Sequence, residues 1–306
     1  MFKYPVTVRL TIDKAAPKFV KAEVLGKKSG KKQKVFWHDT FDMYDPYQTR
    51  KVEMFAQPAF IEPIKSNADH TYAVGYDNGG KRKYLWPCGG DHDENQRSIG
   101  TGEAFQPECD CLSQMRVDPL THGLAGVRYG YDGVCHQATN RIVCPAGLEV
   151  RDAKGYMTKG WKYLTYTLYG RLGIKHKSGL AKWERIKTGC LTKTYPRCSE
   201  DVTLLTHPDD HEGLTQSHVD HIQARVEKAR KTMGETYARL AGGRLTPQEY
   251  ADAMNGHINT FKNDLVPVLG ADLHSAIFEE VADEDVVVVI PHMAERVFAK
   301  GVPDDI

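Results

Sequence analysis

The chain has 306 residues, and its 41 Lys and Arg nearly balance its 40 Asp and Glu. This length suits one large domain or two ordinary ones, and the composition is that of a globular protein with a real core. The charge balance argues against a nucleic-acid binder, which usually carries a basic excess. The sequence contains no run of about 18 apolar residues, so no membrane span is predicted.

The N-terminal region is predicted to be rich in β-structure. Residues 6–12 and 18–25 have the composition of strands. The basic residues that follow surround Ser29-Gly30: Lys27, Lys28, Lys31, Lys32 and Lys34. They indicate a solvated hairpin tip, with a phosphate-contacting patch as the alternative. The first residues lack the apolar centre of a secretory signal, so we expect a cytoplasmic protein.

The middle of the chain mixes strand and loop signals. Residues 70–76 and 83–86 flank Asp77-Asn78-Gly79-Gly80 and predict a β-hairpin. The polar stretch 87–107 predicts a long loop. Strands are predicted at 124–131 and 148–153 around a short helix at 134–143. Aromatic and β-branched residues predict a strand at 161–169, and 174–200 is expected to be further strand and loop.

The C-terminal part changes to helical periodicity. Its first apolar stripe is Ile222, Val226, Ala229, Met233, Tyr237 and Leu240. A second helix is predicted to start with Thr246 as N-cap, Pro247 as first helical residue and Glu249 as capping-box partner. Together these helices predict a hairpin over 215–266, a candidate partner surface. A strand at 286–290 and a helix at 292–300 are expected to follow.

Cys135 is the strongest candidate for chemistry. It follows Gly133, which permits a tight turn, and opens the predicted helix. A helix N-terminus favours the thiolate, and the backbone N–H of Cys135 can serve an oxyanion. The alternatives are a buried structural thiol, a metal ligand and a disulfide partner.

A family resemblance adds to this reading. The run Gly133-Val134-Cys135, followed by Gly147-Leu148-Glu149-Val150-Arg151 and then Gly155-Tyr156, resembles the core of bacterial transglutaminase-like proteins over about residues 130–160. The resemblance implies a papain-like arrangement with Cys135 as nucleophile and with a histidine and an acid on later strands. The family's histidine follows the Gly-Tyr pair, but residues 157–174 contain none.

Two histidines are candidates for the missing base. His176 is the next one downstream, and His122 precedes the cysteine. The upstream position is acceptable because circularly permuted papain-like folds place the histidine strand first, and catalytic roles follow geometry rather than order. His136 ranks third, since adjacent helical residues do not face each other.

Two further clusters are candidate metal sites. The first combines thiols and an imidazole: Cys88, His92, Cys109 and Cys111. Zinc, a disulfide or unlinked thiols would each fit, and without a secretory signal we expect reduced cysteines. The second cluster is rich in histidine: His207, His211, His218 and His221. It would suit a metal-dependent hydrolase or a solvated helix start. No other cofactor is expected.

The sequence therefore predicts an α+β protein with a papain-like core over 70–200, a β-rich segment over 1–69 and a helical segment over 201–306. Cys135 would attack an amide or thioester carbonyl of a protein, peptide or small molecule and form an acyl-enzyme. The acyl group would pass to water, as in a protease or amidase, or to an amine, as in a transglutaminase-like transferase. The alternatives are a metal-dependent hydrolase using the 207–221 histidines and a non-enzymatic interaction protein.

Overall fold

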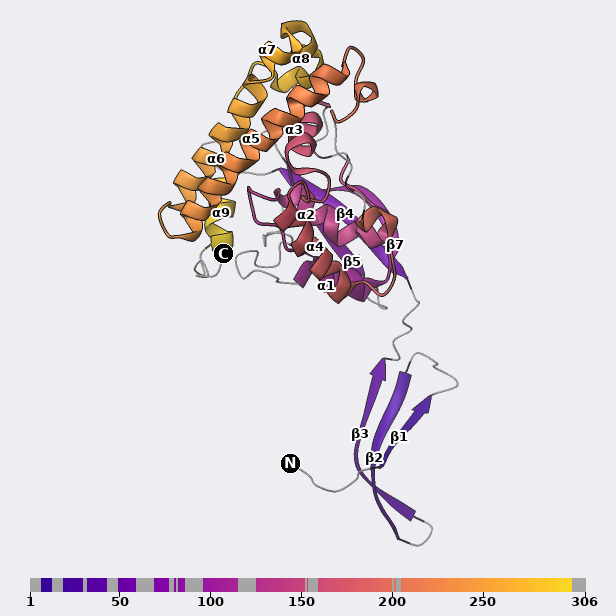
Figure 1. The fold of residues 1–306 in the computed structure, drawn as a ribbon. Helices are drawn as coiled ribbons and strands as arrows, with labels where there is room; N and C mark the ends of the chain where they lie inside the picture. Colours follow the sequence, from indigo (N-terminus) through magenta and orange to yellow (C-terminus); the bar gives the residue numbers. More distant parts are fainter. Residues whose placement is uncertain are drawn as a thin grey trace. The chain divides into compact units, whose positions relative to one another are not determined.

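The computed structural model describes residues 7–12, 19–29, 32–42, 49–58, 69–76, 80, 82–85, 96–114, 125–151, 153, 159–199, 201 and 205–298. The chain divides into two compact units, residues 1–48 and 49–306 (Figure 1). The division precedes the expected boundary at residue 69 because the strand at 50–58 pairs within the second unit. The mixture of helices and antiparallel sheets confirms the α+β class.

The first unit is a three-stranded antiparallel sheet. Its order is β1 (Thr7–Ile12), β2 (Phe19–Ser29) and β3 (Lys32–Asp42), which confirms the two strands expected there. The last pair of the β2–β3 hairpin joins Ser29 to Lys32, so the lysine-rich segment does flank a hairpin tip.

The second unit contains a four-stranded antiparallel sheet in the order β6-β5-β4-β7. Its strands are β4 (Arg50–Pro58), β5 (Asp69–Tyr76), β6 (Arg82–Leu85) and β7 (Arg97–Ala104). The β5–β6 pair confirms the predicted hairpin. β7 corrects the expectation of a loop through 107: its polar residues form a strand because its backbone pairs with β4.

Helices cover this sheet (Figure 1). They are α1 (Gln106–Gln114), α2 (Cys135–Val143) and α4 (Lys177–Cys190). α2, which confirms the helix expected at 134–143, packs on β5 and β4, where Ile142 and Val143 join Val52 and Ala73 in one apolar cluster. This burial fixes α2 against the sheet.

Two disulfides join these elements. Cys111 of α1 is bonded to Cys190 of α4, and Cys144 of η2 (Cys144–Ala146) to Cys198 of η3 (Pro196–Cys198). The expectation of reduced cysteines was therefore wrong for these four. Each bridge is between residues more than 50 positions apart, 79 and 54 respectively, which sequence spacing alone could not pair.

Several predicted strands are corrected. Residues 159–169 form the helix α3 (Lys159–Tyr169), because Trp161, Leu164 and Leu168 are buried at helical spacing. α4 replaces the strand and loop expected at 174–200. The described parts of 124–131 and 148–153 are turns and irregular chain, with one isolated bridge between Tyr129 and Gly133.

The C-terminal helices confirm the predicted hairpin. α5 (Gln216–Ala241) and α6 (Pro247–Asn263) bury their apolar stripes in the largest core cluster. Thr246 caps α6, with Pro247 and Glu249 in the expected positions. η4 (Pro208–Asp210) precedes the hairpin, and α7 (Val266–Leu269), α8 (Ala271–Phe278), η5 (Glu279–Val281) and α9 (Pro291–Phe298) follow it.

The strand expected at 286–290 is instead irregular chain that pairs with no described strand. Its backbone is held by side chains of α6: Asn255 bonds the backbone of Val288 and Val289, and Asn259 that of Val286. The amide side chains thus make the hydrogen bonds that the backbone of a neighbouring strand would otherwise make. Within the described part of the chain, no helix has both the length and the apolar character needed to cross a membrane.

Candidate active site

Cys135 occupies the first position of α2, as the sequence predicts. The Gln137 side chain caps this helix, its Oε1 accepting the Val134 N–H at 2.9 Å. Gly133 makes room for that cap, since a Cβ there would lie 2.6 Å from Gln137 Cγ. The glycine turn and the capping glutamine together set where the helix begins and therefore where the thiol lies.

Cys135 is largely, but not completely, enclosed. Its exposed fraction is 7%, and its neighbours in the core cluster include Val127, Tyr129 and Val134. Among the described cysteines, Cys135 and Cys109 are the two that form no disulfide. Cys109 is fully buried, and burial raises the pKa of its thiol far above the ordinary range. Cys109 is thus a fully buried thiol with which Cys135 can be compared.

α2 places Cys135 near the beginning of β5. Thr139 Oγ1 donates a hydrogen bond to the Thr71 backbone oxygen at 3.0 Å. Cys135 lies one turn before Thr139 on the same helix face, and His70 directly precedes Thr71. This register directs the first turn of α2 toward the Asp69-His70 end of the strand.

An electrostatic interaction supports this register. His136, which follows Cys135, is fully buried, and burial lowers the pKa of its imidazole well below the ordinary value. The second cause of that lowering is an electrostatic interaction with His70. His70 is itself buried. Sequence reasoning missed His70, although Asp69-His70 at the start of a predicted strand was a usable signal.

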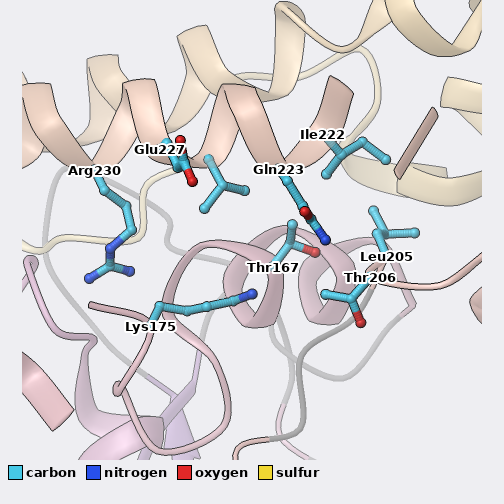
Figure 2. A pocket seen from close by; sticks show the side chains of 9 residues that line it. Thr167, Lys175, Leu205, Thr206, Ile222, Gln223, Glu227 and Arg230 are labelled. Carbon is cyan, nitrogen blue, oxygen red and sulfur yellow. The ribbon is translucent and has the colours of Figure 1, made fainter. Parts of the chain in front are cut away.

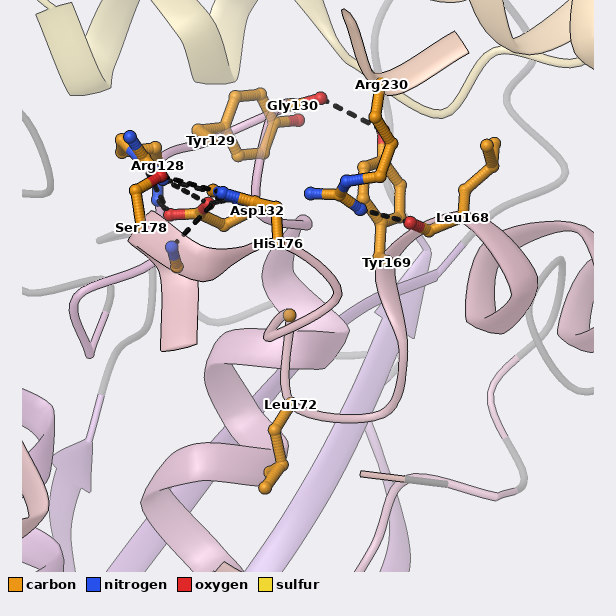
Figure 3. A network of polar contacts seen from close by, with 12 residues as sticks. Arg128, Tyr129, Gly130, Asp132, Leu168, Tyr169, Leu172, His176, Ser178 and Arg230 are labelled. Atoms are coloured by element: carbon orange, nitrogen blue, oxygen red, sulfur yellow. Dashed lines mark hydrogen bonds and ion pairs between the residues drawn. The ribbon is translucent and has the colours of Figure 1, made fainter. Parts of the chain in front are cut away.

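His176, a predicted base, is the N-cap of α4. Its Nδ1 accepts the Gly179 N–H at 3.1 Å and lies 2.7 Å from Ser178 Oγ, while its Nε2 bonds Asp132 Oδ1. Arg128 binds the same carboxylate through Nε and Nη2, both at 2.8 Å (Figure 3). Both ring nitrogens of His176 therefore have partners within this network.

The network has a defined charge state. Burial alone would raise the pKa of Asp132, but the Arg128 charge and the bonds from His176 and Arg128 lower it well below the ordinary value. Burial lowers the pKa of His176 more than Asp132 raises it. At neutral pH an ionised Asp132 therefore accepts from Arg128 and from a neutral His176. The network closes the turn that leads into Gly133 and Cys135, since Asp132 N also donates to Arg128 O at 2.8 Å.

The other predicted residues are placed as follows. His122, Cys88 and His92 lie outside the described residues. Cys111 is in a disulfide, and Cys109 of α1 is buried in the apolar cluster that joins α2 to the sheet. Among the residues that the structure describes, no three His, Cys, Asp or Glu side chains are grouped so that they could hold a metal ion.

The four histidines between 207 and 221 belong to a helix entrance. His218 Nδ1 accepts the Thr215 N–H at 3.2 Å, and Thr215 Oγ1 accepts the His218 N–H, which completes a capping box for α5. His211 Nδ1 lies 2.7 Å from the Glu212 carbonyl oxygen. These contacts are local, and they account for His218 and His211 as structural residues.

Comparison of this chain with protein-family models, with curated proteins and with solved structures finds no match.

Proposed function

We propose that the protein is a cysteine-dependent acyltransferase or amide hydrolase in which Cys135 is the nucleophile. The observation that carries the proposal is a thiol outside the disulfides, at the first position of a helix that packs on β5, whose second residue is His70. The helix N-terminus favours a thiolate, and its backbone N–H groups can stabilise an oxyanion. Cys109, the other described thiol outside the disulfides, lies at the fourth position of α1 and is fully buried.

We assign the base to His70. It lies on β5, which precedes α2 in the chain, so the order is that of a permuted papain-like arrangement. Thr71 faces α2 and the His70 ring stacks on Tyr72, so in this proposal His70 reaches Cys135 around the first residue of the strand. His176 is less suited because both of its nitrogens serve the Asp132 network and the start of α4. His176, Asp132 and Arg128 act instead as positioning residues for the turn before Cys135.

The reaction follows from these roles. His70 accepts the proton of Cys135, and the thiolate attacks the carbonyl carbon of an amide or thioester. The tetrahedral intermediate then collapses, the amine or thiol leaves with a proton from His70, and an acyl-enzyme remains. Water or an amine takes the acyl group and restores the thiol. The substrate is a protein, a peptide or an amide-containing small molecule.

The compartment proposed for this activity is an oxidising one. The two disulfides favour it, because thioredoxin and glutathione keep cytosolic thiols reduced. This differs from the cytoplasmic location expected from the first residues.

Acyl-enzyme formation tests the function directly. The protein would be incubated with a small aryl thioester and its intact mass measured. We expect one acyl adduct that hydroxylamine removes and that Cys135→Ala abolishes. Cys109→Ala is the matched control and should keep the adduct. Equal adduct formation in Cys135→Ala and in the unchanged protein would refute the proposal.

A further inference from the structure

A second site, whose lining does not include Cys135, lies between α3, the loop before α4, and α5. It is a cavity of about 200 Å³ whose polar lining includes Arg230, Lys175, Thr167 and Thr206. Figure 2 shows Arg230 reaching into it from α5 and Lys175 from the loop before α4. We propose that this cavity binds the phosphate or carboxylate group of a small anionic ligand.

Arg230 is the main argument for an anion. Its side chain is only 8% exposed, and its Nη1 donates to the Leu168 carbonyl oxygen. Its Nε and Nη2 are buried and have no hydrogen-bond partner among the described residues. Buried charged donors without partners are costly, so this arrangement implies a missing acceptor.

The geometry of the two unused donors specifies the acceptor. Nε–H and Nη2–H form one edge of the guanidinium plane, and this edge binds two oxygens of a carboxylate or phosphate in parallel. Nη1, on the other edge, is already anchored to Leu168. The anchor therefore orients the fork, and the fork selects an oxyanion over a halide.

The charges around the cavity agree with this assignment. Lys175 provides a second cation on the opposite wall, and burial lowers the pKa of its amine. Asp132 acts electrostatically on Arg230 and Asp201 on Lys175, and a third carboxylate, Glu227, belongs to the lining. Glu227 is exposed at the lining, Asp132 is engaged by Arg128 and His176, and Asp201 accepts the Leu172 N–H at 3.1 Å. None of the hydrogen bonds of these carboxylates within the described residues reaches the unused edge of Arg230.

The volume limits the ligand. At about 30 Å³ for each water, the cavity holds roughly six or seven water molecules. This is below the range of drug-sized ligands, which occupy about 300 Å³ or more. An inorganic phosphate, a short carboxylate or the anionic group of a larger molecule would fit.

Isothermal titration calorimetry on the full chain tests the proposal, with inorganic phosphate in one arm and succinate in the other, both at constant ionic strength in chloride buffer. We expect saturable binding in at least one arm, which also identifies the preferred oxyanion. Lys175→Met should weaken it by about tenfold or more, and Arg230→Lys, which keeps the charge but removes the fork, should weaken it similarly. Lys231→Met, at an exposed position of α5, is the matched control and should bind as the unchanged protein does.

Two results would overturn the site: no saturable heat with either anion, or equal affinities for Lys175→Met and the unchanged protein. Equal affinities would also show that the heat comes from a general effect of the added salt and not from binding in the cavity. Because Lys175 makes the test independent of Arg230, a variant of Arg230 that fails to fold does not decide it. Cys135→Ala should bind the anion normally, so failure of this proposal is distinct from failure of the acyl-transfer proposal.

Discussion

The two ends of α2 carry cysteines in opposite states. Cys144, just beyond the C-terminal end, is covalently bonded to Cys198, and nearby Arg141 is fully buried among backbone carbonyls. Cys135, at the N-terminal end, forms no disulfide and retains slight exposure. The comparison teaches that the helix is anchored at one end and presents its reactive group at the other. A nucleophile gains from such a rigid support, because small displacements reduce catalysis strongly.

The largest expected effect comes from removing the covalent anchor. Replacing both Cys144 and Cys198 by Ala opens a bridge with a sequence separation of 54. Loop-closure entropy for a loop of that size predicts a loss of about 4 kcal/mol in the free energy of unfolding. Urea denaturation measures it, and a loss below about 1 kcal/mol would show that the bridge does not anchor α2.

Arg141 is the second part of the same anchor. Its guanidinium donates to the carbonyl oxygens of Leu172 at 2.6 Å, Ala125 at 3.0 Å and Gly173 at 3.2 Å. Burial lowers its pKa to about 10. Arg141→Leu leaves three buried carbonyls without this donor and should destabilise the fold by about 3 kcal/mol. The exposed Arg239→Leu serves as control, and equal unfolding curves for the two variants would contradict this role.

The turn before Cys135 should respond to acid. The folded pKa values of His176 and Asp132 are both lowered, so the unfolded chain binds protons first. Their stabilisation is present at neutral pH. It is lost as pH falls, beginning near the unfolded value of about 6.5 for His176 and of about 3.9 for Asp132.

Urea denaturation at pH 7 and pH 5 checks the histidine part. His176→Asn keeps a side chain that can cap α4 and should lose less stability between the two pH values than the unchanged protein. Identical losses would show that His176 does not carry this pH dependence. The effect should be smaller than either anchor variant, since one neutral imidazole is involved rather than a covalent bond or a buried cation.

Local signals in the sequence were sufficient for some elements. Thr246, Pro247 and Glu249 specify the start of α6 because a capping box is made by neighbouring residues. The same holds for Gly133 and the start of α2. The strand predicted at 161–169 was wrong, because Trp161, Leu164 and Leu168 follow a helical period that the composition obscured. Tertiary burial decided that case, as it often does for aromatic segments.

The candidate site was only half predictable for a related reason. Cys135 is recognisable because its helix is local, whereas the packing of α2 on β5 joins residues far apart in the chain, such as Thr71 and Thr139, which are 68 positions apart. His176 is close in sequence to the expected family position, yet the structure uses it to cap α4. The disulfides were unpredictable for the same reason of distance along the chain.

The rate of Cys135 alkylation by iodoacetamide at pH 6.5, followed by peptide mass spectrometry on the folded protein, tests the central claim most directly. An ordinary thiol, with a pKa of about 8.5, is nearly all protonated at that pH and reacts slowly. The account predicts that Cys135 is alkylated well before Cys109 and that His70→Ala slows this reaction while leaving Cys109 unchanged. Alkylation of Cys135 no faster than that of Cys109, with or without His70, would contradict it.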